Sequence, residues 1–232
     1  MQDEVAKHTK KIYRAWKSPQ HSIAEKIKEI IIEILIIVFA VTISIWFHNW
    51  SEHSHEQQEV KEFLKGLSYN LTDDIHQLAT NKNVIEHLQS NYKKILVPEK
   101  GHESDVDSLI AHFEADLRVT RPNIGRYEGF KSSGKIGNIE NDSLRENILV
   151  FYEQTIPELV YGENFVNDLQ VKIQELSFEN SYKISPRQFA TIPKINSLLW
   201  LEAHNFEVNT RGYDKAADNA KRIINQIKNE LD

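Results

Sequence analysis

Residues 30–50, IIIEILIIVFAVTISIWFHNW, decide how this chain is organised. Over residues 30–47 the run is apolar except for one Glu, one Thr and one Ser. Eighteen helical residues extend about 27 Å, which is close to the thickness of the hydrocarbon core of a bilayer. The sequence therefore predicts a basic head at 1–29, one transmembrane helix at 30–50 and a polar region at 51–232, with the lipid bilayer as a partner.

The charge on either side of the span predicts its direction. Seven Lys or Arg and three acids precede Glu29, which gives the head a net charge of +4, whereas the whole chain carries −6. Because positive charge next to a span is retained in the cytoplasm, we expect a single-pass protein of the bacterial inner membrane with a cytoplasmic N-terminus and a periplasmic C-terminal domain. A cleaved signal peptide is the alternative, but the leading region is too long and no small-x-small site follows Phe47.

A long amphipathic stalk helix is predicted for residues 51–97. The segment has one glycine, Gly66, and no proline, and its apolar residues recur at steps of three and four. Such a helix packs either on its own domain or in a coiled-coil seam between copies, and periodicity does not separate the two. The residues with this spacing are Val60, Leu64, Leu67, Leu71, Ile75, Leu78, Ile85, Leu88, Tyr92 and Ile95.

Helix start and stop signals divide the middle of the chain. Ser104 is expected to cap a helix that reaches Leu117, because Asp107, three residues later, completes a capping box with it. Pro122 then excludes helical geometry from the residue before it. Gly134 is well placed to end a short helix.

The C-terminal part also has a helical pattern. Asn141 or Asp142 is expected to cap a long helix that Pro157 kinks, and two further helices are expected at 195–204 and 213–231. No useful length of sequence alternates as a strand does. Residues 51–232 are numerous enough to bury a core of their own. The fold class is therefore predicted to be all-α, with one transmembrane helix that continues into the stalk and a soluble helical-bundle domain.

Two segments resemble an uncharacterised family of small bacterial single-pass membrane proteins, a domain of unknown function. In the first, Glu33 and HNWSE at 48–52 stand where the family has a Glu, an apolar run and NNWNE. This chain departs from the family at Ala40, where Gly is usual, and at Trp46, where Gln is usual. The resemblance implies an architecture but no activity. The second segment matches the family at Pro122, Asn123, Tyr127, Ser132, Ser133, Gly134, Ile139, Leu144, Arg145 and Tyr152.

One stripe of the predicted span is a candidate packing face. An acid in a span is a functional hypothesis, and two small residues four apart let helices approach closely. We therefore predict a homo-oligomer that packs through this face. The alternative for the acid is that it lies at the inner interface and reaches water or a basic neighbour. The residues of the face are Glu33, Ile37, Ala40 and Ser44.

A His-rich segment follows the span. Four of its side chains share one helical face at a spacing able to ligate zinc, but the segment lacks any metal signature, and polar His-rich stretches are usually solvated helix. We assign no metal site and no cofactor to it. The six residues are His48, Glu52, His53, His55, Glu56 and Glu59, of which His53 and Glu56 lie off the shared face.

Cations and hydroxyls around KSSGK form a candidate site for an anionic ligand at a helix terminus. The spacing is not that of a P-loop, and the alternative is structural, with Gly134 ending a helix above packed Tyr127 and Ile139 side chains. A nucleic acid duplex is not an expected partner, because the polar region is acidic and lacks a basic stripe. The candidate residues are Arg126, Lys131, Ser132, Ser133, Lys135 and Arg145.

The sequence has no GxSxG, no HExxH and no cysteine, so we expect no enzyme and no catalytic residues. The favoured hypothesis is an oligomeric membrane scaffold or sensor that binds a protein partner in the envelope or a small ligand. The alternative is a membrane effector whose assembled spans form a pore, or disrupt the membrane, when the soluble domain binds an anionic signal.

Overall fold

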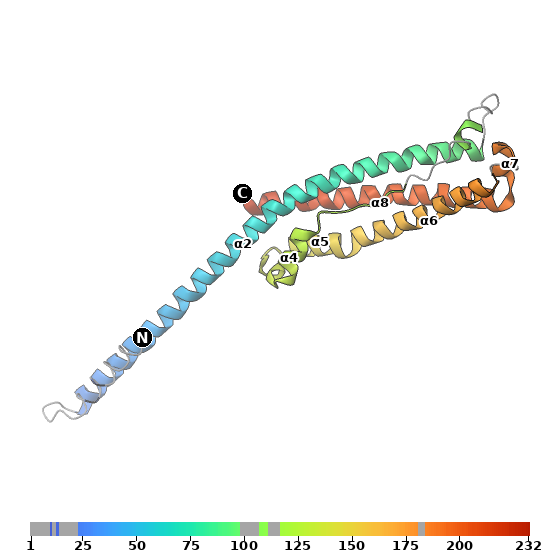
Figure 1. Ribbon diagram of the computed structural model, residues 1–232. Coiled ribbons are helices and arrows are strands. Elements are labelled where there is room, and N and C mark those ends of the chain that lie inside the picture. Colours follow the sequence, from blue (N-terminus) through green and yellow to red (C-terminus); the bar gives the residue numbers. More distant parts are fainter. Residues whose placement is uncertain (1–9, 11–12, 14–22, 98–106, 111–116, 181–183) are drawn as a thin grey trace. The chain divides into compact units, whose positions relative to one another are not determined.

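The computed structural model describes residues 10, 13, 23–97, 107–110, 117–180 and 184–232 (Figure 1). Within these ranges the regular structure is helical throughout, which confirms the predicted all-α class. The chain divides into two compact units, Met1–Glu59 and Val60–Asp232. The elements are α2 (Ile23–Leu96), α4 (Gly125–Ser132), the 3₁₀ turn η1 (Lys135–Asn138), α5 (Asp142–Val150), the π-helical turn η2 (Phe151–Thr155), α6 (Ile156–Asn180), α7 (Pro186–Thr191) and α8 (Pro193–Leu231).

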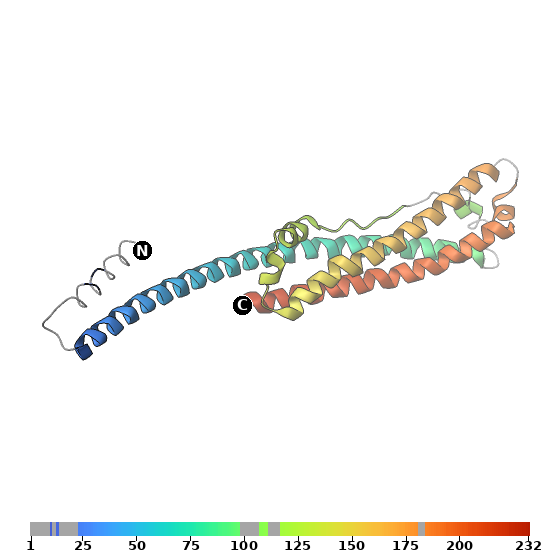
Figure 2. The same cartoon turned by 90° about the horizontal axis from the view of Figure 1, so that it is seen from below.

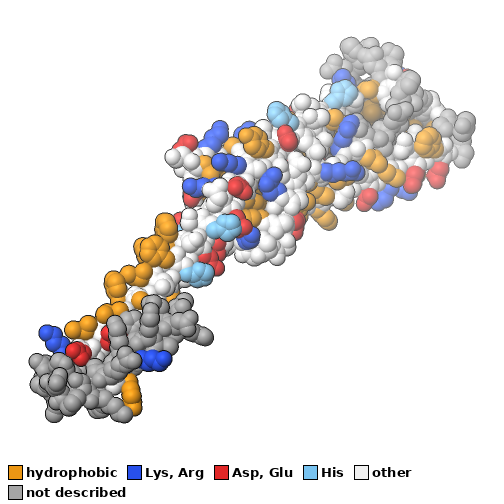
Figure 3. Space-filling view, turned by 60° about the vertical axis from the view of Figure 1, so that its left-hand side comes forward, with side chains coloured by type: hydrophobic (Ala, Val, Ile, Leu, Met, Phe, Trp, Pro, Cys, Tyr) orange, Lys and Arg blue, Asp and Glu red, His pale blue; other side chains and the backbone are white. Residues whose placement is uncertain are grey.

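In the first unit, α2 carries the apolar run with its side chains uncovered. By length and composition, α2 is the one candidate membrane span in the described part of the chain, and none of its most apolar window is buried. Leu35 and Phe39 are 61% and 68% exposed, and Figure 3 shows part of this apolar surface in orange. The hydroxyls of Thr42 and Ser44 each donate to the carbonyl four residues earlier, at 2.8 Å, so neither leaves a polar group unsatisfied on an apolar surface.

In the second unit, α2 packs within its own chain. The residues that recur at three and four along the stalk lie in one core shared with α6 and α8: all are buried except Ile75 and Leu88, which are partly buried against it. Tyr92 packs edge-on against Phe206 of α8, with ring centroids 5.1 Å apart. The apolar stripe of the stalk is therefore part of the hydrophobic core of its own domain.

Helices α6 and α8 are antiparallel and lie side by side in Figures 1 and 2. Gly212 of α8 leaves room for a larger side chain of α6: the Cβ that Gly212 lacks would lie 3.1 Å from Leu159. The prediction of separate helices at 195–204 and 213–231 was wrong, since α8 is unbroken from Pro193 to Leu231. Gly212 is a packing residue inside a helix and does not end one.

The long helix predicted to begin at Asn141 or Asp142 consists of three consecutive elements, α5, η2 and α6. Asn141 is its N-cap and accepts a hydrogen bond from the Leu144 N–H at 3.1 Å, as expected. The irregularity expected at Pro157 lies just before it, where the Ile156 N–H donates to the Phe151 carbonyl across a π-helical turn. Proline is tolerated in the first turn of α6, because a wider turn accommodates the missing donor.

The remaining local predictions concern the connections. Gly134 follows α4 with φ of 76°, the left-handed conformation that ends a helix, as predicted. Residues 107–110 are helical and Leu117 is not, while the proposed cap Ser104 lies outside the described residues. Pro122 lies in a non-helical segment, as its sequence predicted.

Candidate functional site

An extended segment, residues 117–123, runs beside α6 and is named the strap here (Figure 2). An extended chain that is not part of a sheet needs partners for its N–H and C=O groups. In this protein polar side chains of α2 and α6 supply those partners. The strap and these side chains are the most highly organised polar feature of the second unit.

From α2, side chains on one face bind the second half of the strap. The carboxylate oxygen Oδ1 of Asp74 accepts the backbone N–H and the side-chain amide of Asn123, both at 2.9 Å. The Gln77 side chain accepts the Arg121 N–H at 2.7 Å, and Asn70 donates to the Asn123 carbonyl at 3.2 Å. These α2 residues are spaced three and four apart, so they face the strap together.

From α6, Glu163 binds the centre of the strap. One of its oxygens accepts the Thr120 N–H at 2.7 Å, and the other accepts the Thr120 hydroxyl at 2.6 Å and the Tyr213 hydroxyl of α8 at 2.7 Å. Asn81 of α2 donates to the same Thr120 hydroxyl at 3.2 Å. Because Glu163, Thr120, Tyr213 and Asn81 are all buried or nearly so, this network joins the three long helices through the strap.

Burial changes the acidity of several groups around the strap. It raises the pKa of Asp74, which the two hydrogen bonds from Asn123 partly oppose. It also raises the pKa of Tyr213 and of Tyr152 above their ordinary values, and the nearby Asp74 charge contributes to the rise for Tyr152. The buried acids here therefore act as hydrogen-bond acceptors for the fold.

A further buried acid, Glu202 of α8, lies away from the strap. It is completely buried, and burial raises the pKa of its carboxyl to about 8, with the Tyr92 hydroxyl of α2 slightly opposing the rise. Burial and the neighbouring Glu202 raise the pKa of Tyr92 well above its ordinary value. At neutral pH Glu202 is therefore mostly a neutral acid, which is the form a core tolerates.

Sequence reasoning missed these acids, although a signal was present. Asp74, Glu163 and Glu202 each occupy a step of the apolar three-and-four pattern where a hydrophobic residue is expected. An acid at such a position is either exposed by a break in the helix or paired in the core. The partners of Asp74 and Glu163 are in the strap and, for Glu163, also in α8, 40 or more residues distant in sequence.

The residues predicted to bind an anionic ligand lie on α4, η1 and α5, and most are engaged within the protein. Lys131 forms an ion pair with Glu153 at 2.5 Å, and the Tyr127 hydroxyl donates to the same carboxylate at 2.6 Å. This lowers the pKa of Glu153. Arg145 donates to the Ile139 carbonyl at 2.9 Å and pairs with Asp142 at 2.5 Å.

The other candidates in this group have local roles. The hydroxyls of Ser132 and Ser133 donate to the carbonyls of Gly129 and Phe130, at 3.2 and 2.8 Å. Lys135 begins η1, and Arg126 is exposed with its guanidinium over Gly66 of α2. An anion at this place would compete with existing contacts of Lys131 and Arg145, and its binding stays a prediction.

Two glycines at helix contacts give opposite predictions. A Cβ at Gly66 would overlap only the mobile end of Arg126, whereas a Cβ at Gly162 would overlap the side-chain oxygen of buried Asn209, whose amide donates to the Gly162 carbonyl at 3.2 Å. Since Ala favours helix over Gly, Gly66→Ala should stabilise by up to about 1 kcal/mol. Gly162→Ala should destabilise by about 1–2 kcal/mol. Urea unfolding followed by circular dichroism measures both, and a loss of stability in Gly66→Ala would show that Arg126 cannot move.

The His-rich segment after the proposed span and the candidate packing face within it both lie on α2. His48 and Glu52 approach to 4.0 Å and His55 and Glu59 to 3.7 Å, as two separate pairs of which only Glu59 is partly buried. Among the described residues no group of three or more His, Cys, Asp and Glu is placed to hold a metal ion. On the candidate packing face, the Ser44 hydroxyl donates a hydrogen bond to the Ala40 carbonyl. This leaves a small and apolar surface for a neighbouring helix.

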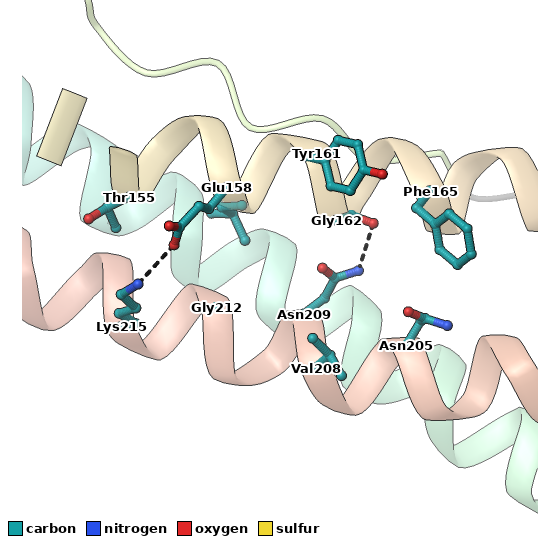
Figure 4. Close-up of a pocket in the computed structure, with 11 residues that line it drawn as sticks. Thr155, Glu158, Tyr161, Gly162, Phe165, Asn205, Val208, Asn209, Gly212 and Lys215 are labelled. Carbon is teal, nitrogen blue, oxygen red and sulfur yellow. Dashed lines mark hydrogen bonds and ion pairs between the residues drawn. The ribbon is translucent and has the colours of Figure 1, made fainter. Parts of the chain in front are cut away.

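A groove between α6 and α8 has a volume of about 440 Å³ (Figure 4). Gly162 and Gly212 are among the residues that line it, together with exposed apolar side chains. The residues around it are Thr155, Glu158, Leu159, Tyr161, Phe165, Asn205, Val208, Asn209 and Lys215.

The fold and the strap define the class: an all-α protein with one candidate membrane span and a helical domain held by a side-chain-bound extended segment. Residues 33–206 match the family described as Family of unknown function (DUF6090), and the chain belongs to this family. The match begins at Glu33 and includes the whole strap, which confirms membership of an uncharacterised family. Comparisons with curated proteins and with solved structures gave no match.

Proposed function

We propose that this protein is a non-enzymatic, single-pass protein of the bacterial inner membrane whose helical domain acts as an oligomeric scaffold or sensor for a protein partner or a small ligand. The observation that carries the proposal is the composition of α2. One helix contains both the uncovered apolar run and the buried stripe of the domain core. A span that continues into a domain core is suited to anchoring that domain and to passing a binding event to the membrane.

The buried acids support a role in binding over a role in catalysis. The carboxylate oxygens of Asp74 and Glu163 accept hydrogen bonds from the backbone and side chains of the strap. Charged groups committed to such contacts stabilise the fold and are not poised to transfer protons to a substrate. The alternative is an anion-triggered membrane effector. We rank it second because Lys131 and Arg145, two of the cations that would bind the anion, already form ion pairs within the domain.

Topology is the experiment that tests the proposal. Reporters that are active only in the periplasm or only in the cytoplasm, fused after Asp232, should report a periplasmic C-terminus. Reversing the charge bias, by replacing the Lys residues at 7, 10 and 11 with Glu, should weaken this orientation. A cytoplasmic C-terminus in the unaltered chain would contradict the proposal and would favour the membrane effector.

A further inference from the structure

The groove between α6 and α8 has the surface chemistry of a docking site. Tyr161, Phe165 and Val208 beside it are 77%, 40% and 46% exposed. Aromatic side chains next to a hollow are the residues that contribute most to binding at protein interfaces. Asn209 lies against Gly162 and donates to its carbonyl, and Leu159 lies against Gly212, so side chains of the protein fill the space beside both glycines. The Gly162 carbonyl therefore needs no ligand, and the surface that the groove offers to an occupant is its exposed apolar side chains.

The charges beside the groove are balanced between the two helices. Glu158 of α6 and Lys215 of α8 pair at 2.9 Å across one end of the groove (Figure 4). On the exposed side of α8, Arg211 pairs with Glu207 at 3.8 Å. All four side chains are more than half exposed, so these pairs contribute little to stability and can exchange partners at small cost. The edges of the groove therefore carry both signs of charge.

We propose that the occupant of this groove is the same groove of a second copy of the chain, so that α6 and α8 of two copies form a four-helix contact. The proposal rests on the oligomeric scaffold proposed above and names the surface through which its helical domains meet. In a two-fold contact each surface feature meets its own copy. A surface with an acid on α6 and a base on α8 is complementary in charge to a second copy of itself when α6 of each copy lies over α8 of the other. Glu158 of each copy then lies next to Lys215 of the other copy.

The same pattern argues against other occupants. A strongly basic or strongly acidic partner would leave Glu158 or Lys215 facing a like charge, which is costly at an interface. The exposed Tyr161 and Phe165 rings fit an apolar counterpart, and the second copy provides the same rings and the exposed Val208. Shape and charge thus favour the same occupant.

Single-cysteine cross-linking tests the proposal, since the natural chain has no cysteine. Full-length Val208→Cys, reconstituted in lipid bilayers, should cross-link between copies with a bismaleimide whose reach is about one helix diameter, ~11 Å. Val171→Cys is the matched control, because Val171 is also an exposed valine, at 36%, but lies on α6 outside the groove. We expect a cross-linked yield at least tenfold higher for Val208→Cys. Equal yields from the two variants would overturn the proposal.

A second variant tests whether the contact uses the groove. Tyr161→Arg, added to Val208→Cys, places a cation in the contact and should lower the yield at least tenfold. Tyr69→Arg changes an equally exposed tyrosine of α2 and should leave the yield unchanged. Because both positions are exposed, circular dichroism should show folded protein in each case. An unchanged yield in Tyr161→Arg would overturn the proposal, as would cross-linking of Val208→Cys to a different protein in native membranes.

Cross-linking through the span separates this inference from the proposed function. Ala40→Cys lies on the candidate packing face of the span and reports assembly there. Cross-linking at residue 40 without cross-linking at residue 208 keeps the oligomeric scaffold and overturns the groove contact. Cross-linking at 208 alone supports the groove contact and removes the packing role of the span. Absence of both would overturn both.

Discussion

Glu163→Gln should lower the free energy of unfolding by about 3 kcal/mol. The carboxylate accepts three hydrogen bonds, from the Thr120 N–H, the Thr120 hydroxyl and the Tyr213 hydroxyl. A glutamine has almost the same shape, but its amide nitrogen donates and does not accept, so at least one of the three hydrogens from Thr120 and Tyr213 would lose its acceptor inside the core. A buried donor without an acceptor costs most of its desolvation free energy.

The change should be detected both globally and locally. Urea unfolding of the full-length protein in mild detergent, followed by circular dichroism, measures the free energy. Limited trypsin digestion measures release of the strap, because Arg118 becomes accessible when the strap detaches and Arg121 is protected by the proline after it.

Glu175→Gln is the control for this experiment, since Glu175 is an exposed acid of the same helix. It should change stability by less than about 0.5 kcal/mol. If Glu163→Gln unfolds like this control and resists trypsin equally well, the carboxylate is not what holds the strap.

Features set by neighbouring residues in the chain were predictable from the sequence. The apolar run and its length indicated the candidate span, and the three-and-four spacing indicated the stalk. Gly134 and Asn141 act locally, through a left-handed backbone and through a bond to an N–H three residues on. These effects depend on a few adjacent residues, so sequence alone contains the information.

The strap and the groove depend on contacts between distant residues. Glu163 accepts hydrogen bonds from Thr120, 43 positions before it, and from Tyr213, 50 positions after it, and no local pattern links the three residues. The break predicted between residues 204 and 213 was wrong, and Gly212 lies inside α8, where its lack of a side chain admits Leu159. The hydrogen bonds of the strap and the contact between Gly212 and Leu159 can be recognised only when the packing of the strap, α6 and α8 is known.

Glu202→Gln should stabilise the protein by about 3 kcal/mol at pH 7 and remove a pH dependence. Burial raises the pKa of this carboxyl from 4.5 to about 8. Between these values the unfolded chain releases the proton and the folded chain keeps it, so the free energy of unfolding falls as pH rises, by about 1.4 kcal/mol per pH unit. Below pH 4.5 the acid is protonated in both states and costs nothing, and above about pH 8 the loss is complete. The glutamine side chain of the variant would stay neutral throughout.

The difference in unfolding free energy between Glu202→Gln and the natural protein, measured at several pH values, isolates this group from all others that titrate. It should be small at pH 4, grow through the neutral range and level off above about pH 8. The Tyr92 hydroxyl is the titratable group of α2 that acts on Glu202, and Tyr92→Phe should move the upper end of the range to higher pH, because that hydroxyl lowers the pKa of the acid. Glu207→Gln, on the exposed side of α8, is the matched control variant. A difference that stays constant from pH 4 to pH 9 would mean that Glu202 is as acidic in the folded core as in the unfolded chain, and that the core supplies it with a partner when it ionises.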